Sequence, residues 1–128
     1  MATSDDLRTK RATRLLLFAV AALSLLVAAC AGDVAAPEVP GGDPQLVEGR
    51  DIYIANCATC HGATGEGGRG SKLNEGRVLE RYPEIVDQIE LVAGGNGAMP
   101  AFSGRLSEAE IEAVVRYTRD ILAETQNE

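Results

Sequence analysis

The amino-acid sequence predicts an all-α fold, with three to four helices in one small domain. Three segments space their apolar residues three and four positions apart, as amphipathic helices do. Two of these segments begin with a residue suited to cap a helix N-terminus. No segment alternates apolar and polar residues like a half-buried strand. With 128 residues and no tryptophan, the chain can build one small core and an accessory segment.

The accessory segment lies at the N-terminus, where basic residues precede the apolar run LLLFAVAALSLLVAA at 15–29. As a helix this run would be about 22 Å long, shorter than the roughly 30 Å hydrocarbon core of a membrane. We therefore predict a signal peptide over residues 1–29 and an exported protein. The stretch VAAC resembles the lipobox of bacterial lipoproteins, which implies that Cys30 carries a lipid. An ordinary signal peptide and an uncleaved anchor are the alternatives.

Residues 30–43 are predicted to be a flexible tether, because small residues, prolines and glycines leave little to bury. The folded domain is predicted over 44–128. Its first helix should begin after Asp43, whose carboxylate can cap the helix, with Pro44 at the first helical position. The apolar residues of this helix are Leu46, Val47, Ile52, Tyr53 and Ile54.

Two more helices are predicted towards the C-terminus. In YPEIVDQIELVAGG an apolar stripe ends at two glycines; its members are Ile85, Val86, Ile89 and Val92. In SEAEIEAVVRYTRDILAE, Ser107 and Glu110 form a capping-box pattern. The predicted buried face of this last helix comprises Ile111, Val114, Val115, Thr118 and Leu122.

The first helix runs into the motif CATCH, which contains Cys57, Cys60 and His61. A redox-active thiol pair would need a strand-and-helix context that the chain does not show. A disulfide within this motif would close too short a loop to stabilise much. Zinc would need a fourth ligand, which an acidic side chain would have to supply. The remaining interpretation is one covalently attached haem c, with both thiols bonded to the porphyrin and His61 bound to the iron.

A second axial ligand to the iron has one good candidate. His61 is the only histidine, and Met1 lies in the leader, so Met99 is the only thioether in the rest of the chain. Pro100 disfavours a helical conformation at Met99, and glycines surround it in GGNGAMPAFSG. We predict that Met99 projects from an irregular loop towards the iron. The alternative is a methionine that only fills the core.

Together these motifs resemble a small class I cytochrome c. The stretches that carry the resemblance are NCATCHG, GSKL, GGNGAMPAF and the C-terminal amphipathic helix, and they extend over residues 44–124. The resemblance implies a cytochrome c fold around one covalently attached haem. The implied haem-site residues are Cys57 and Cys60 as thioether sites, His61 as proximal ligand, Met99 as distal ligand and Leu73 in the pocket wall.

The resemblance also implies that Gly49 and Tyr53 cross the C-terminal helix near Tyr117. One departure from the family is visible. Where the family commonly has Gly-Pro-x-Leu, with the proline carbonyl orienting the proximal histidine, this chain has GSKL at 70–73. Ser71 still offers a backbone carbonyl for that role. Three cations are candidates to face the haem propionates, or else are solvated surface charges: Arg69, Lys72 and Arg77.

The expected function is one-electron transfer on the outer side of a bacterial membrane, by a carrier that is not an enzyme. Expected partners are redox proteins, such as a quinol-oxidising complex, a dehydrogenase or a terminal oxidase, and the membrane itself through the lipid anchor. The net charge of −7 disfavours nucleic acid and predicts docking on positive surfaces. The alternative is a haem-based ligand sensor or a peroxidase-like enzyme in which Met99 dissociates.

Overall fold

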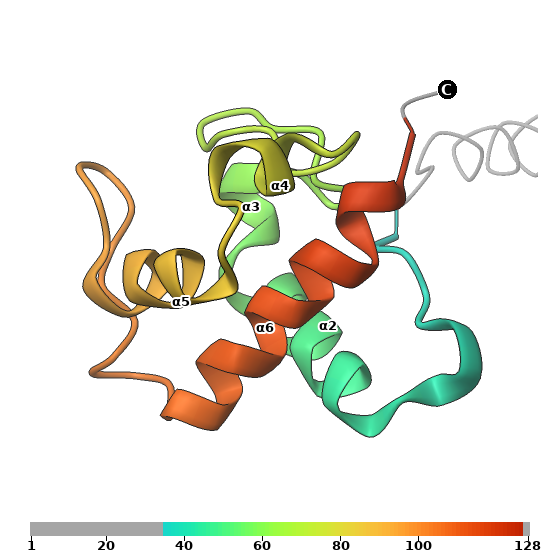
Figure 1. Ribbon diagram of the computed structural model, residues 1–128, viewed down its shortest axis with the longest axis horizontal. Coiled ribbons are helices and arrows are strands. Elements are labelled where there is room, and N and C mark those ends of the chain that lie inside the picture. Colours follow the sequence, from blue (N-terminus) through green and yellow to red (C-terminus); the bar gives the residue numbers. More distant parts are fainter. Residues whose placement is uncertain (1–34, 127–128) are drawn as a thin grey trace, which may run out of the picture. The chain divides into compact units, whose positions relative to one another are not determined.

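The computed structural model describes residues 35–126; the predicted signal peptide and Cys30 lie outside this part of the chain. Within it the secondary structure is helical, apart from one isolated bridge between Asn96 and Met99, which confirms the all-α prediction (Figure 1). The elements in chain order are η2 (Pro40–Gly42), α2 (Pro44–Asn56), α3 (Ala58–His61), α4 (Arg77–Arg81), α5 (Ile85–Gly94), α6 (Glu108–Asp120) and η3 (Leu122–Glu124). No helix in residues 35–126 has both the length and the apolar character needed to cross a membrane.

Helices α2 and α6 begin at the residues that the sequence predicted. The Asp43 carboxylate accepts hydrogen bonds from the backbone N–H groups of Gln45 (2.9 Å) and Leu46 (3.3 Å). At the start of α6, the Ser107 N–H donates to the Glu110 carboxylate (2.8 Å) and the Glu110 N–H donates to the Ser107 hydroxyl (3.3 Å). Each cap satisfies backbone groups that the first helical turn leaves without a partner.

The crossing of α2 and α6 forms the centre of the core. A Cβ atom on Gly49 would lie 2.1 Å from the carbonyl oxygen of Ala113, so only glycine allows the two backbones to approach this closely. One turn later, the rings of Tyr53 and Tyr117 pack with centroids 5.6 Å apart, and both residues are fully buried. The predicted contact of Gly49 and Tyr53 with α6 near Tyr117 is confirmed.

Helix α5 buries only part of the apolar stripe that the sequence predicted, since Ile89 packs against the core but the first two members do not. Ile85 and Val86 are 38% and 53% exposed, whereas Gln88 and Val92 are buried. The amide of Gln88 donates to the hydroxyl of Thr118 on α6 (2.8 Å). A buried polar group is tolerated when it has such a partner, so the helix can turn Gln88 inwards. The prediction was therefore wrong for Ile85 and Val86.

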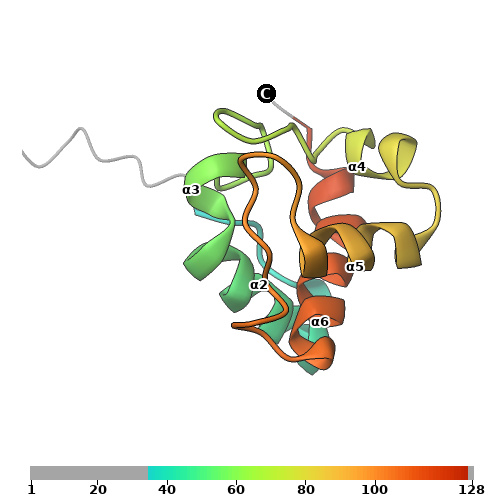
Figure 2. The same cartoon turned by 90° about the vertical axis from the view of Figure 1, so that its left-hand side faces the viewer.

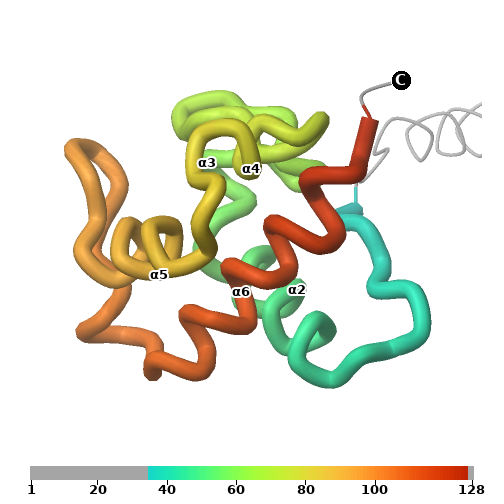
Figure 3. The backbone as a smooth tube through the Cα atoms, viewed as in Figure 1, coloured from blue at the N-terminus to red at the C-terminus, as the bar shows by residue number. Residues whose placement is uncertain are grey.

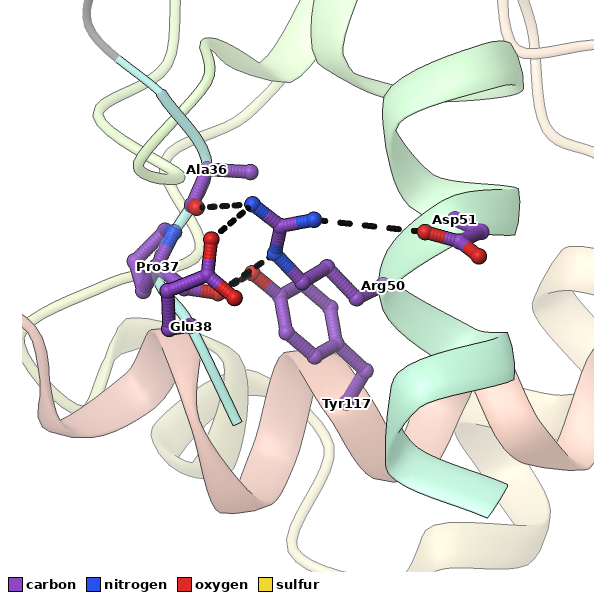
Figure 4. A network of polar contacts seen from close by, with 6 residues as sticks. All are labelled: Ala36, Pro37, Glu38, Arg50, Asp51 and Tyr117. Carbon is purple, nitrogen blue, oxygen red and sulfur yellow. Dashed lines mark hydrogen bonds and ion pairs between the residues drawn. The ribbon is translucent and has the colours of Figure 1, made fainter. Parts of the chain in front are cut away.

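The segment before α2 also differs from the predicted flexible tether. Residues 36–38, here called the N-terminal strap, are held against α2 and α6 (Figure 4). Arg50 donates to the carbonyl oxygens of Ala36 and Pro37 (both 3.0 Å) and pairs with Glu38 (2.7 Å). The hydroxyl of Tyr117 also donates to the Pro37 carbonyl (2.8 Å). These bonds fix the middle of the expected tether on the domain surface.

Candidate cofactor site

The five residues that the sequence predicted for the site line one cavity of about 280 Å³: Cys57, Cys60, His61, Leu73 and Met99. The cavity walls come from α3, the loop at 69–73, α4, the end of α5 and the loop that follows α5. In Figure 2 this last loop, in orange, crosses the face turned towards the viewer. Phe102, which is buried, and Leu91 add apolar surface to the walls.

The two cysteines of the motif are free thiols, and both are half-buried. Cys57 comes directly after α2, and its N–H donates to the Tyr53 carbonyl (2.8 Å), so the end of α2 places it at the cavity. Burial, with a smaller contribution from the nearby Cys60, raises the pKa of the Cys57 thiol to about 11. Thiol redox centres depend on a lowered thiol pKa, so this environment does not favour that chemistry.

The imidazole of His61 has one nitrogen engaged and one available. Nδ1 lies 2.7 Å from the carbonyl oxygen of Ser71. A carbonyl oxygen can only accept, so Nδ1 carries the proton and Nε2 keeps its lone pair for a metal ion. The structure confirms that the Ser71 carbonyl engages His61, although serine stands where the family commonly has proline.

Gly70 supports the His61 ring from a second direction. A Cβ atom on Gly70 would lie 2.7 Å from Cε1 and 2.8 Å from Nδ1 of the ring, so the imidazole packs directly on the glycine backbone. The Gly70 N–H donates to the Cys60 carbonyl (2.7 Å) and the Gly67 N–H donates to the His61 carbonyl (2.8 Å). These bonds tie the glycine-rich loop back to α3, which holds the ring in one orientation.

Met99 lies in an irregular loop, as the sequence predicted. Asn96 and Met99 exchange two backbone hydrogen bonds of 3.0 Å, and the Phe102 N–H donates to the Val92 carbonyl (3.1 Å). The loop can fold back on α5 because Gly95 has a φ of +74°, and a Cβ there would lie 2.7 Å from the Met99 carbonyl oxygen. Backbone contacts therefore set the position of Met99 at the cavity.

The sequence interpretation missed helix α4 and what it brings to the cavity. Val78, Arg81 and Tyr82 line the wall beside the three cations named above. A five-residue helix is too short to show an apolar period, so no pattern could reveal it. Within residues 35–126, no group of three or more His, Cys, Asp and Glu side chains is placed to hold a metal ion, so the zinc alternative finds no ligand set there.

A profile for the family described as "Cytochrome C oxidase, cbb3-type, subunit III" matches residues 44–117. A cytochrome c6 from a Synechococcus species is 39% identical over 83 residues, which cover 63% of this chain and 74% of that protein. The cbb3-type cytochrome c oxidase subunit FixP of Azorhizobium caulinodans is 38% identical over 85 residues. That match covers 64% of this chain but only 29% of the length of FixP.

Two solved structures resemble the domain. Cytochrome c6 from the diatom Phaeodactylum tricornutum superimposes with a TM-score of 0.52 at 37% identity, covering 59% of this chain and 91% of that one. Cytochrome cL from the methylotroph Methylophaga aminisulfidivorans gives a TM-score of 0.56 at 22% identity, covering 63% of this chain and 55% of that one. The second likeness is one of fold alone.

Proposed function

The chain belongs to the cytochrome c family that the cbb3-type subunit III profile describes, as a class I monohaem cytochrome, and on that premise we propose that it carries single electrons between redox proteins on the outer side of a bacterial membrane. It carries covalently bound haem c, and it is an electron carrier rather than an enzyme.

The residues at the cavity fit a covalently attached haem. Cys57 and Cys60 are unbridged thiols at one wall and would form the two thioether bonds. His61 keeps Nε2 free and would be the proximal ligand, with Met99 as the distal ligand and Leu73 in the apolar wall. The observation that carries the assignment is the meeting of these donors at one cavity, with His61 already held through Nδ1.

When bound, the haem supplies an iron that cycles between the ferrous and ferric states. The residues of the chain orient and shelter it. The Ser71 carbonyl and the Gly70 backbone hold His61 in one tautomer and one orientation, which limits rearrangement during electron exchange. Buried apolar wall residues, among them Phe102 and Val78, would limit the access of water to the haem.

A sulfur ligand is the part of this assignment that a variant can test best. Met99→Leu keeps the apolar volume but removes the sulfur, so we expect the reduction potential to fall by on the order of 100 mV. We also expect rapid carbon monoxide binding by the ferrous protein. Leu91→Ala is the matched control, because Leu91 lines the same cavity and has no donor atom. A Met99→Leu protein with the wild-type potential and no carbon monoxide binding would contradict the distal-ligand assignment. Rapid binding by the wild type would favour a ligand sensor.

We propose that the protein is exported and anchored through a lipid on Cys30. The supporting observations are the basic and apolar leader and the VAAC stretch, which lie outside the described residues. A lipid anchor predicts that Cys30→Ser moves the folded protein from the membrane fraction to a soluble extracytoplasmic fraction, or stalls processing of the leader. Intact-mass measurement of the N-terminus is the direct check, and a mature chain without an acyl mass would contradict the anchor.

The proposed partners are redox proteins in or at that membrane. The FixP relative is named as an oxidase subunit, which supports a terminal oxidase as one candidate acceptor. A quinol-oxidising complex or a dehydrogenase would be the donor. Kinetics of electron exchange with purified complexes of each class would decide among them.

A further inference from the structure

Ser71 connects two side chains that lie at the same cavity. Its carbonyl oxygen accepts the Nδ1 proton of His61 (2.7 Å), and its hydroxyl oxygen accepts a hydrogen bond from Nη1 of Arg81 (3.3 Å). Arg81 is the last residue of α4 and lines the cavity together with His61. A guanidinium group is therefore bound to the same residue that orients the imidazole.

The charge of Arg81 is less neutralised than the charges of Lys72 and Arg77. Lys72 pairs with Glu75 (2.7 Å) and Arg77 pairs with Glu80 (3.0 Å). Among the side chains of residues 35–126, Arg81 forms no ion pair, and its hydrogen-bond acceptor is the Ser71 hydroxyl. Glu80, which lies nearby, is paired with Arg77, so the positive charge of Arg81 acts on Ser71 without a directly paired carboxylate.

The backbone around Ser71 does not depend on Arg81 for its position. On one side, the Gly70 N–H donates to the Cys60 carbonyl (2.7 Å), and on the other, the Leu73 N–H donates to the Gly65 carbonyl (2.7 Å). Removal of the guanidinium should leave the Ser71 carbonyl in place. The contribution of Arg81 is then electrostatic rather than a matter of folding.

We propose that Arg81 is a positioning residue that acts through Ser71 to raise the reduction potential of the haem; this rests on the proposed role of His61 as the proximal ligand. A carbonyl that accepts the N–H of a metal-bound imidazole makes that imidazole a stronger electron donor, which favours ferric iron. A cation held on the same residue draws electron density from the carbonyl and weakens this effect. Arg81 therefore favours the ferrous state.

The test compares reduction potentials and the NMR signal of the His61 Nδ1 proton in the ferrous holoprotein. Arg81→Gln should lower the potential and move the Nδ1 proton to lower field, because the carbonyl becomes a stronger acceptor. Arg81→Lys keeps the charge, so the reduction potential and the chemical shift of the Nδ1 proton should both stay close to their wild-type values. Arg116→Gln is the charge-matched control: Arg116 lies on α6, interacts with Gln45 and Asp120, and does not line the cavity.

A double-mutant cycle tests whether the effect passes through Ser71. Ser71→Ala keeps the carbonyl and removes the hydroxyl, so Arg81→Gln should shift the potential less in the Ser71→Ala background than in the wild type. An equal shift in both backgrounds would overturn the proposal and show an effect of charge through space. An Arg81→Gln protein with the wild-type potential and the wild-type Nδ1 signal would overturn it as well.

The proposed function and this proposal fail in different ways. If the wild-type His61 ring protons were not shifted by an adjacent haem, His61 would not be the ligand, and the site assignment itself would be wrong. If those protons were shifted but the Arg81 variants left the potential unchanged, only the role of Arg81 would be wrong.

Discussion

The α2–α6 crossing and the cavity are two differently built regions of one small domain. In Figure 3, the segment before α2, in cyan, lies at the end of the domain opposite α5 and the loop that follows it. At the crossing, the fully buried rings of Tyr53 and Tyr117 fill the space between two helices. At the cavity, short helices and glycine-rich loops surround about 280 Å³ that the chain itself does not fill.

The two regions bury their apolar surface in different ways. The crossing is closed by side chains, so it should be stable before any cofactor is bound. The cavity walls gain their full burial only when the haem fills the space between them, so this region should contribute more to the holoprotein than to the apoprotein. Tyr53 joins the two regions: its hydroxyl donates to the carbonyl of Gly62 at the end of α3 (2.6 Å), and its carbonyl accepts from the Cys57 N–H (2.8 Å).

The largest effect on stability is expected at the crossing. Gly49→Ala would place a Cβ atom 2.1 Å from the Ala113 carbonyl oxygen, so α2 and α6 would have to move apart. We expect the free energy of unfolding to fall by about 3 kcal/mol, measured by denaturant unfolding. Gly94→Ala is the control, because a Cβ there meets nothing within 4 Å. Equal stability of the two variants would contradict the close helix crossing.

A smaller loss of stability but a larger effect on the haem is expected at Gly70. A methyl group there would press on the His61 ring, with 2.7 Å to Cε1, and the ring would have to leave its hydrogen bond to Ser71. We expect Gly70→Ala to cost about 1–2 kcal/mol of folding free energy and to reduce the yield of correctly ligated holoprotein, measured by absorption spectra. Gly104→Ala, where a Cβ would meet nothing within 4 Å, should match the wild type in both respects. A normal Gly70→Ala spectrum would show that the ring is not held by this glycine.

The smallest effect is expected from the hydroxyl that holds the N-terminal strap. Burial, partly offset by Arg50 and reinforced by Glu38, raises the pKa of Tyr117 to about 12 from a usual value of 10.0. Because the folded state binds this proton more tightly, its contribution to stability is complete below pH 10 and is lost as the pH rises through about 12. Tyr117→Phe should cost about 1 kcal/mol at neutral pH, since Pro37 keeps its bond from Arg50. It should also reduce the loss of stability between pH 10 and 12. An unchanged alkaline profile would indicate that Tyr117 does not titrate in this way.

The sequence alone determined the features that depend on neighbouring residues. Asp43 and Ser107 cap their helices through backbone groups two or three positions away, so the pattern of residues was enough to place both helix starts. The thiols and the imidazole of the CATCH motif likewise lie within five consecutive residues, so the motif could be recognised from the sequence. The glycines and Pro100 around Met99 were enough to predict an irregular loop.

Only the tertiary structure decided the features that depend on residues far apart in the chain. Gln88 is buried because Thr118, 30 positions away, offers a hydroxyl, and no local pattern contains that partner. The strap is fixed because Arg50 and Tyr117, 13 and 80 positions from Pro37, meet at its carbonyl. A local pattern predicts that a polar or flexible segment is exposed, because the partners that satisfy its polar groups are distant in the chain. Here the packing of α5 and α2 against α6 brings those partners together.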